Sequence, residues 1–202
     1  MTAQPGNAQP RNRPRKLLKR EDRIASILAA AARAFAVGGF AATSMEDIAA
    51  EAGVTKLIVY RHFATKQQLY ERVLDDTRRR LQETLQFRRR GPSQDMIGEL
   101  LGVARKEPEA FTLLFRHSAR EPQFAGYVAA FRERAVQVAE NALEPAVPDP
   151  LVRHWVAATS FALVIEGLLQ WLEHGDPARD AEIATYLGRL AGAAVPAVTM
   201  RA

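Results

Sequence analysis

The chain has 202 residues, of which 48% are hydrophobic and 25% charged, so it is long enough to bury a core as one large domain or two small ones. It contains no cysteine, which excludes disulfides, thiolate metal sites and cysteine nucleophiles, and its four histidines show none of the usual metal-ligand spacings. The net charge of +5 divides unevenly, because residues 1–91 carry 18 Lys/Arg against 9 Asp/Glu and the remaining residues carry 10 against 14. The basic first half predicts a polyanionic partner for that half, with a merely solvated basic face as the alternative.

The first 19 residues are polar, basic and Pro-containing, a composition that predicts a disordered arm. They lack the apolar stretch of about 7–15 residues that a signal peptide needs. Further along, residues 155–172 are apolar and long enough to span a membrane, but they include Glu166 and Gln170. A central carboxylate costs about 2.5–3.5 kcal/mol on insertion, so a buried bundle helix is the better interpretation.

Helical periodicity begins at Arg20, and apolar residues then recur in steps of three and four until Gly38-Gly39, which permit a left-handed cap. A second helix is expected over residues 45–52, because Ser44 and Asp47 have the spacing of a capping box and Gly53 follows. A long helix is expected over residues 66–87.

Prolines and glycines divide the rest of the chain into further helical stretches, near residues 93–106, 109–120, 123–144, 150–174 and 178–195. No segment alternates at period two for long enough to form a sheet, and no internal repeat is present. The sequence therefore predicts an all-α fold of about nine helices.

The stretch "GVTKLIVYRHF", residues 53–63, has the branched and aromatic residues of a β-strand, yet helical sequence flanks it on both sides. Ala49, Gly53 and Val59 have the spacing of a helix-turn-helix: a small residue allows close crossing, a glycine turns the chain, and an aliphatic side chain locks the second helix to the first. The stretch is therefore interpreted as a short helix whose strand propensity is overridden by its context.

In this frame Val59 and Phe63 face the core, and the outward residues of the short helix include Leu57 and Ile58. Exposed apolar side chains at this position suit contact with thymine methyl groups in the major groove, and Tyr60 and Lys66 suit phosphates. For Leu57 the alternative is packing on the following helix, and for Tyr60 it is a ring packed on its own helix.

Residues 20–73 resemble the DNA-binding segment of the TetR/AcrR family of bacterial transcriptional regulators. The resemblance rests on Gly39, Thr43-Ser44, Ile48-Ala49, Ala52-Gly53-Val54, Tyr60-x-x-Phe63 and Thr65-Lys66. It implies phosphate contacts for Thr43, Ser44, Thr55, Lys56, Tyr60, His62 and Lys66, and base reading by Arg61 and its outward neighbours. Leu57-Ile58 departs from the small residues common in the family at that point, so these two positions are expected to set the base preference. Arg11, Arg13 and Arg15 of the arm could follow the adjacent minor groove, with a solvating tail as the alternative.

The second half resembles the same family more loosely, in "LLFRHSAREPQFAGYVAAF" and "EGLLQWLEHGD", which implies a ligand pocket and a helical dimer interface. Small residues on the last two helices, with apolar neighbours, are candidates for close helix approach between two copies: Ser160, Leu163, Gly167, Trp171, Ala181, Thr185, Gly188 and Gly192. A stripe that packs within one chain is the alternative.

An apolar pocket with a few polar groups is expected among Phe111, Phe115, His117, Phe131, Trp155, Thr159 and Glu166. Each aromatic residue or histidine taken singly is equally compatible with plain core packing. Glu166 either binds a cationic ligand or pairs with Arg116, Arg120 or Arg153.

Together these features favour a cytoplasmic, nucleoid-associated homodimeric repressor that a small apolar or amphipathic effector releases from a palindromic operator. The expected domains are the arm (1–19), the helix-turn-helix domain (20–65) and a ligand-binding and dimerisation domain (66–202). No cofactor or metal is expected. The alternatives are a DNA-binding regulator controlled by a protein partner or by no effector, and a helical enzyme; the sequence shows no P-loop, GxSxG or dinucleotide-binding turn.

Overall fold

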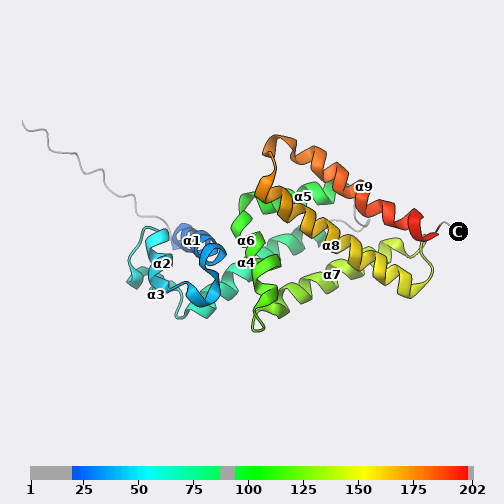
Figure 1. The fold of residues 1–202 in the computed structure, drawn as a ribbon. Coiled ribbons are helices and arrows are strands. Elements are labelled where there is room, and N and C mark those ends of the chain that lie inside the picture. The colour runs from blue at the N-terminus through cyan, green and yellow to red at the C-terminus, as the bar shows by residue number, and fades with distance from the viewer. Residues whose placement is uncertain (1–19, 87–93, 200–202) are drawn as a thin grey trace, which may run out of the picture.

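The computed structural model describes residues 20–86 and 94–199, and within them every regular element is helical, as predicted (Figure 1). The α-helices are α1 (Arg20–Ala42), α2 (Met45–Glu51), α3 (Lys56–His62), α4 (Lys66–Gln86), α5 (Gln94–Lys106), α6 (Pro108–Thr112), α7 (Ala125–Leu143), α8 (Pro150–His174) and α9 (Asp180–Thr199). Figure 1 shows an elongated molecule with α1–α3 at one end, called the head here, and α5–α9 forming the body. Helix α4 runs from the head into the body.

The strand-like stretch forms helix α3, which confirms the helical interpretation. The break expected after the first helix also occurs, because Gly39 has φ of 73° and the chain adds one more turn, to Ala42. Helix α2 begins with the predicted capping box: the Ser44 amide donates to Asp47 Oδ2 at 2.8 Å, and the Asp47 amide donates to Ser44 Oγ at 3.1 Å. These reciprocal bonds satisfy two amides at the start of α2. The Ser44 hydroxyl also donates to Asp47 Oδ2 at 2.7 Å, and this bond, followed by the one from the Ser44 amide, holds the Asp47 pKa below its usual value.

A cluster of four aromatic rings joins the head to the body. Phe35 and Phe40 of α1 meet Tyr70 of α4 at centroid distances of 4.8 and 5.1 Å, and Tyr70 stacks on Phe124, which precedes α7, at 4.2 Å. The Tyr70 hydroxyl has no hydrogen-bond partner among the described residues, and burial raises its pKa to about 12. Removal of these rings from water stabilises the junction, and edge-to-face contacts add about 0.5–1.5 kcal/mol for each pair.

In the body α9 packs on α5 and α8, and α8 packs on α7. Arg105 of α5 holds Asp180 at the start of α9 through two donors at 3.1 and 3.0 Å, and the Trp171 indole of α8 donates to the same carboxylate at 2.7 Å. By length and composition alone α1 and α8 are each apolar enough to cross a membrane. The packing of α8 between α7 and α9 agrees instead with the bundle helix expected from Glu166.

Two segments differ from the regular helices expected there. Residues 113–117 form a π-helical turn and residues 118–120 a 3-10 turn, and the Ser118 hydroxyl donates to the Leu114 carbonyl inside this irregular segment. At the other end, α9 continues through Pro196 to Thr199 and so extends past the expected end at residue 195.

Candidate nucleic-acid interface

Helices α2 and α3 form a helix-turn-helix held by local chemistry. Gly53 has φ of 62°, a left-handed conformation that a side chain would strain, and it turns the chain out of α2. Val59 of α3 is completely buried together with Ile48 and Ala49 of α2, so the packing fixes which side of α3 faces away from the core. The outward face of α3 is the candidate interface.

That face combines apolar and basic groups. Leu57 is 69% exposed and Tyr60 42% exposed, and Lys56 and Arg61 are also exposed. The structure places Leu57 in solvent rather than on the following helix. Ile58 differs from the expectation: it is half-buried and packs against the core, because Val59 at the next position sets the rotation of the helix. Of the Leu-Ile pair, Leu57 is therefore the side chain that the head presents outward.

Lys56 is paired in the absence of DNA. Its ammonium bonds to the carboxylate of Glu46 on α2 and lies 5.4 Å from the centroid of the Tyr60 ring. The hydrogen bond raises the Lys56 pKa and lowers the Glu46 pKa, so both groups are charged at neutral pH. A phosphate that contacts Lys56 would compete with Glu46 for the ammonium. Sequence reasoning missed Glu46, although its position in the first turn of α2 was visible.

Two residues expected to contact phosphate have other partners in the structure. The Lys66 ammonium donates to the carbonyls of Phe40, Ala41 and Thr43 at 2.7, 3.2 and 2.8 Å, which uses its three donors on the chain that ends α1. The Thr43 side chain is buried, and its hydroxyl lies 2.7 Å from the Gly39 carbonyl and 3.2 Å from that of Ala34. We therefore assign to both residues a part in positioning α2.

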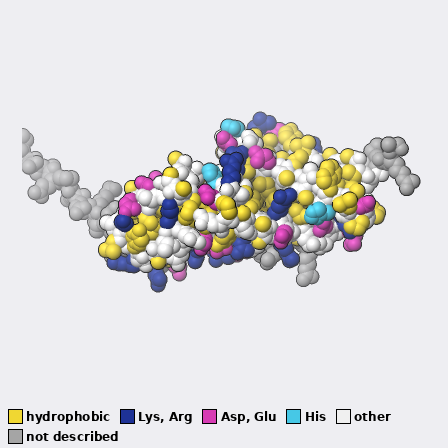
Figure 2. Space-filling view, turned by 60° about the horizontal axis from the view of Figure 1, so that its bottom comes forward, with side chains coloured by type: hydrophobic (Ala, Val, Ile, Leu, Met, Phe, Trp, Pro, Cys, Tyr) yellow, Lys and Arg dark blue, Asp and Glu magenta, His cyan; other side chains and the backbone are white. Residues whose placement is uncertain are grey.

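The other expected contacts fall into two groups. Thr55 is exposed, and Ser44 and His62 are partly exposed beside the α2 and α3 ends. Arg11, Arg13 and Arg15 lie outside the described residues. Figure 2 shows Lys and Arg side chains along the lower edge of the head end, so a basic surface accompanies the helix-turn-helix. Such a surface suits a polyanionic backbone.

In the body, the residues expected to line a pocket fall into an interior group and an exposed group. The Phe115 ring lies between those of Phe111 and Phe131, at centroid distances of 4.7 and 5.5 Å. Phe161 of α8 also contacts the Phe115 ring. Burial, followed by the nearby Arg120 and Arg116 charges, lowers the pKa of the half-buried His117.

On α8 the remaining pocket candidates face outward. Trp155 is 59% exposed, and Thr159 is exposed one turn later. Glu166 accepts hydrogen bonds from Gln170 at 2.9 Å and Arg116 at 3.2 Å, so the structure contains the arginine pair that was one of its two expected roles. The three residues are therefore not brought together with the phenylalanine rings.

Several residues expected at a dimer interface pack within the chain. A Cβ at Gly167 would lie 2.4 Å from the Leu187 Cδ2 atom, and the Ser160 hydroxyl donates to the Ala191 carbonyl of α9 at 3.4 Å. Trp171 bonds to Asp180. The small residues thus allow α8 and α9 to approach each other. Thr185 and Gly188 are partly exposed, whereas Ala181, Leu163 and Gly192 are exposed.

An outward apolar stripe lies on the same two helices, and of its apolar residues sequence reasoning assigned only Leu163 to an interface. Leu151 is 79% exposed, and with Trp155, Thr159 and Leu163 it recurs every four residues on α8. Tyr186 and Leu190 continue the exposed apolar surface on α9. Figure 2 shows hydrophobic side chains gathered at the end of the molecule opposite the head. The four-residue spacing of Leu151, Trp155 and Leu163 was the signal that could have revealed the stripe.

A capped helix, a glycine turn and a core-locked second helix with an exposed apolar and basic face define a helix-turn-helix DNA-binding protein. The comparisons agree. The family described as "Bacterial regulatory proteins, tetR family" matches residues 27–73. The HTH-type transcriptional activator FasR of Mycolicibacterium smegmatis is 27% identical over 184 residues, covering 82% of this chain and 80% of FasR. The HTH-type transcriptional repressor Rv3405c of Mycobacterium tuberculosis is 54% identical over 56 residues, 28% of this chain and 30% of the repressor.

Solved structures show the same fold. A TetR-like transcriptional regulator from Rhodococcus sp. RHA1 has a TM-score of 0.74 at 22% identity, covering 92% of this chain and all of that chain. AibR, solved with isovaleryl coenzyme A and operator DNA, has a TM-score of 0.60 at 21% identity, covering 86% and 98% of the two chains. The FadR regulator of Bacillus subtilis, solved with stearoyl-CoA, has a TM-score of 0.59 at 13% identity, covering 83% and 96%.

The DNA-binding segment of the chain, residues 27–73, belongs to the TetR family of bacterial transcriptional regulators, and the whole chain shares the fold of TetR-like regulators. It is a DNA-binding regulator, which implies action in the cytoplasm, and membership of this family excludes the helical enzyme considered as an alternative. Among the described residues, no three or more His, Cys, Asp or Glu side chains are grouped to hold a metal ion.

Proposed function

We propose that the protein is a homodimeric, nucleoid-associated repressor that binds a palindromic operator and is released by a small apolar or amphipathic effector. The observation that carries the DNA-binding part is the outward face of α3, where Leu57 is exposed beside Lys56, Tyr60 and Arg61 while Val59 anchors the helix. Leu57 meets a thymine methyl group, Arg61 reads a base edge, and Lys56 and Tyr60 hold phosphates. Thr55, Ser44 and His62 add backbone contacts, and the arginines of the arm follow the minor groove.

The dimer places two such heads on successive major grooves, about 34–36 Å apart. Its interface is the stripe of Leu151, Trp155, Leu163, Tyr186 and Leu190 on α8 and α9, flanked by the exposed Ala181 and Gly192 and the partly exposed Thr185 and Gly188. A large exposed apolar patch marks an interaction surface, and identical patches on two copies satisfy each other in a twofold dimer. Residues 20–65 are the DNA-binding domain and residues 66–202 the effector and dimer domain, with α4 shared between them.

The effector binds in the aromatic interior between α6, α7 and α8. Phe111, Phe115, Phe131 and Phe161 supply apolar walls, and the neighbouring structures solved with isovaleryl coenzyme A and stearoyl-CoA make acyl-CoA thioesters the first class to test. A ligand that parts these rings moves α4, whose 21 residues extend about 32 Å at 1.5 Å each. The change in separation of the two heads weakens operator binding, with a coupling of about 1–3 kcal/mol.

The second candidate is a DNA-binding regulator controlled by a protein partner or by no effector. The mutual contact of the four phenylalanine rings favours it, because a filled interior offers a ligand no ready-made space. The two candidate functions have the same DNA-binding head. They differ only in whether a small molecule, a protein partner or no effector acts on the body.

The experiment is selection of bound fragments from random DNA, followed by release assays with acyl-CoA thioesters of two to eighteen carbons. We expect a palindromic consensus that Leu57→Ala alters at a T-containing position in each half-site, with Arg132→Ala, an exposed residue of α7, as the control outside the head. Release of the selected operator by one chain-length class supports the effector proposal. Specific binding without release by any thioester favours the second candidate, and absence of any selected sequence contradicts both.

A further inference from the structure

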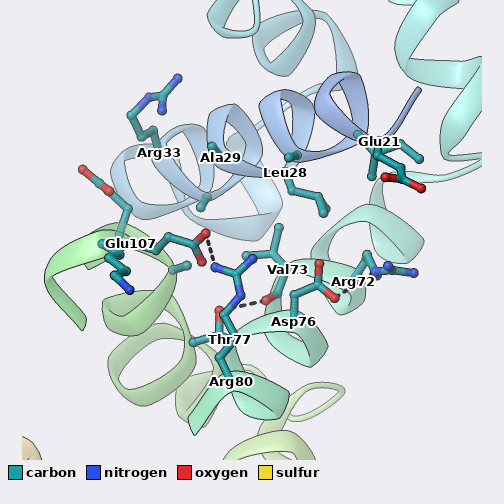
Figure 3. A pocket seen from close by; sticks show the side chains of 16 residues that line it. Glu21, Leu28, Ala29, Arg33, Arg72, Val73, Asp76, Thr77, Arg80 and Glu107 are labelled. Carbon is teal, nitrogen blue, oxygen red and sulfur yellow. Dashed lines mark hydrogen bonds and ion pairs between the residues drawn. The ribbon is translucent and has the colours of Figure 1, made fainter. Parts of the chain in front are cut away.

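A cleft separate from the aromatic interior lies where the head meets the body. It has a volume of about 320 Å³, and α1, α4 and the start of α6 line it. Figure 3 shows Leu28 and Ala29 pointing from α1 toward Val73 and Thr77 of α4, which gives the cleft apolar walls. None of the residues of α3 or of the phenylalanine interior lines it. The volume lies at the lower end of the roughly 300–1,000 Å³ typical of ligand pockets, so the cleft suits a small molecule.

Arg80 supplies the cation at the middle of this cleft. Figure 3 shows its side chain rising from α4 to meet Glu107, the residue before α6, and these two groups form an ion pair. Glu107 is the one carboxylate paired with Arg80 in the part of the chain that the structure describes. A guanidinium has five N–H donors, so Arg80 retains donors for another acceptor. The lining also contains Arg33, which pairs with Glu51, Arg72, which pairs with Asp76, and the exposed Lys106.

The carboxylates that line the cleft limit what charge a ligand can carry. Asp76 is already held by Arg72 and Arg79, each at 3.1 Å. Glu21 and Glu109 also line the cleft and would repel a polyanion such as a phosphate monoester. A single negative charge on a short apolar body meets Arg80 and the apolar walls with the least repulsion.

We propose that this cleft binds a small organic monoanion, a carboxylate or sulfonate with a short apolar body. The head group binds the Arg80 donors that Glu107 leaves free, and the body lies against Leu28, Ala29 and Val73. This site goes beyond the effector role of the phenylalanine interior and does not depend on it.

The test is calorimetric titration of the full chain without DNA, using octanoate as the anionic probe and octylammonium as a cation of the same length. We expect octanoate to bind with one site per chain and octylammonium not to bind. Arg80→Gln weakens octanoate binding about tenfold or more, as loss of a charged hydrogen bond does. Glu107→Gln strengthens it, because the competing carboxylate is removed. Ala29→Phe, which fills the cleft, also weakens it.

The matched control is Arg78→Gln, which removes the same charge from the same helix, on a side chain that pairs with Asp75 and, like Asp75, does not line the cleft. Octanoate binding that is unchanged in Arg80→Gln and Ala29→Phe would place the anion elsewhere and overturn the proposal. So would preference for octylammonium, absence of octanoate binding, or weaker binding in Glu107→Gln. Glu107→Gln keeps the test decisive if Arg80→Gln disturbs folding, and none of these outcomes bears on DNA binding.

Discussion

At the scale of single residues, Lys56 and Lys66 are both paired in the absence of DNA, in two different ways. Lys56 is paired on the surface with Glu46, where solvent competes and phosphate can replace the carboxylate. Lys66 is directed to three backbone carbonyls and cannot leave them without exposing unpaired acceptors. Lys56 is therefore free to exchange its partner for a DNA phosphate, whereas Lys66 stabilises the fold, although both side chains carry the same charge.

Glu46→Gln is expected to strengthen operator binding, because no carboxylate then competes with phosphate for Lys56. Binding of the selected operator, measured across salt concentrations, checks this. Glu51→Gln is the matched control, since Glu51 lies on the same helix and pairs with Arg33 instead. Equal gains in both variants would mean that only the net charge matters. The opposing variant, Lys56→Gln, should lower the salt slope by about one.

Lys66→Met is expected to lower the free energy of unfolding by about 1–3 kcal/mol, because three carbonyls lose a charged donor. Urea denaturation followed by circular dichroism measures this loss. A phosphate-contact role predicts the opposite pattern, with unchanged stability and a salt slope smaller by about one.

At the scale of helices, the start of α9 is fixed by one carboxylate. Asp180 accepts from Arg105 of α5 and Trp171 of α8, so three helices meet at a single partly buried group. The hydrogen bonds from Arg105 and then Trp171 hold the Asp180 pKa below its usual value. A carboxyl group whose pKa is lowered by folding stabilises the fold above its unfolded pKa, and this contribution is lost as the pH falls through the folded pKa.

Asp180→Asn is therefore expected to destabilise the chain by about 1–2 kcal/mol at pH 7. The difference in free energy of unfolding between the two proteins should stay constant above about pH 5 and shrink below about pH 4, the ordinary aspartate range. Urea titrations at several pH values measure it. A difference that grows toward low pH would contradict the assignment, and Asp176→Asn, in the loop before α9, serves as a comparison.

Local chemistry explains which helices could be predicted from sequence. The capping box of Ser44 and Asp47, the glycine turn at Gly53 and the anchor at Val59 are short-range patterns, so α2 and α3 were both predictable. The π and 3-10 turns after Leu113 were not, since helical periodicity does not distinguish them. Ile58, Lys66 and Trp155 were placed differently by the structure because their surroundings come from segments distant in sequence.

At the scale of the whole molecule, the small residues of α8 and α9 form contacts within the chain, whereas several large apolar residues of the same helices are exposed. Gly167 and Ser160 let the two helices approach within the chain, and Leu151, Trp155 and Leu190 are left outside. This division suits a four-helix interface in which each copy contributes a pre-packed pair of helices.

Leu190→Glu is expected to convert the proposed dimer to a monomer, because it places a charge without a partner in the proposed apolar interface. Sedimentation velocity should show the mass fall from twice that of the chain to that of a single chain, and operator affinity should fall with it. Ala129→Glu, an equal charge on the exposed face of α7, should leave the mass unchanged. A wild-type protein that is already monomeric would refute the dimer.

The aromatic cluster bears on how this regulator can be recombined with others. Tyr70 lies beyond the expected head boundary at residue 65, yet its ring is a neighbour of both Phe35 and Phe40. A chimaera joined at residue 65 would give these rings a foreign α4, whereas a junction placed after Leu81 would carry the complete head with its own supporting helix. The transplantable unit is thus longer than the DNA-contacting unit, and grafting a new operator specificity onto another body requires both.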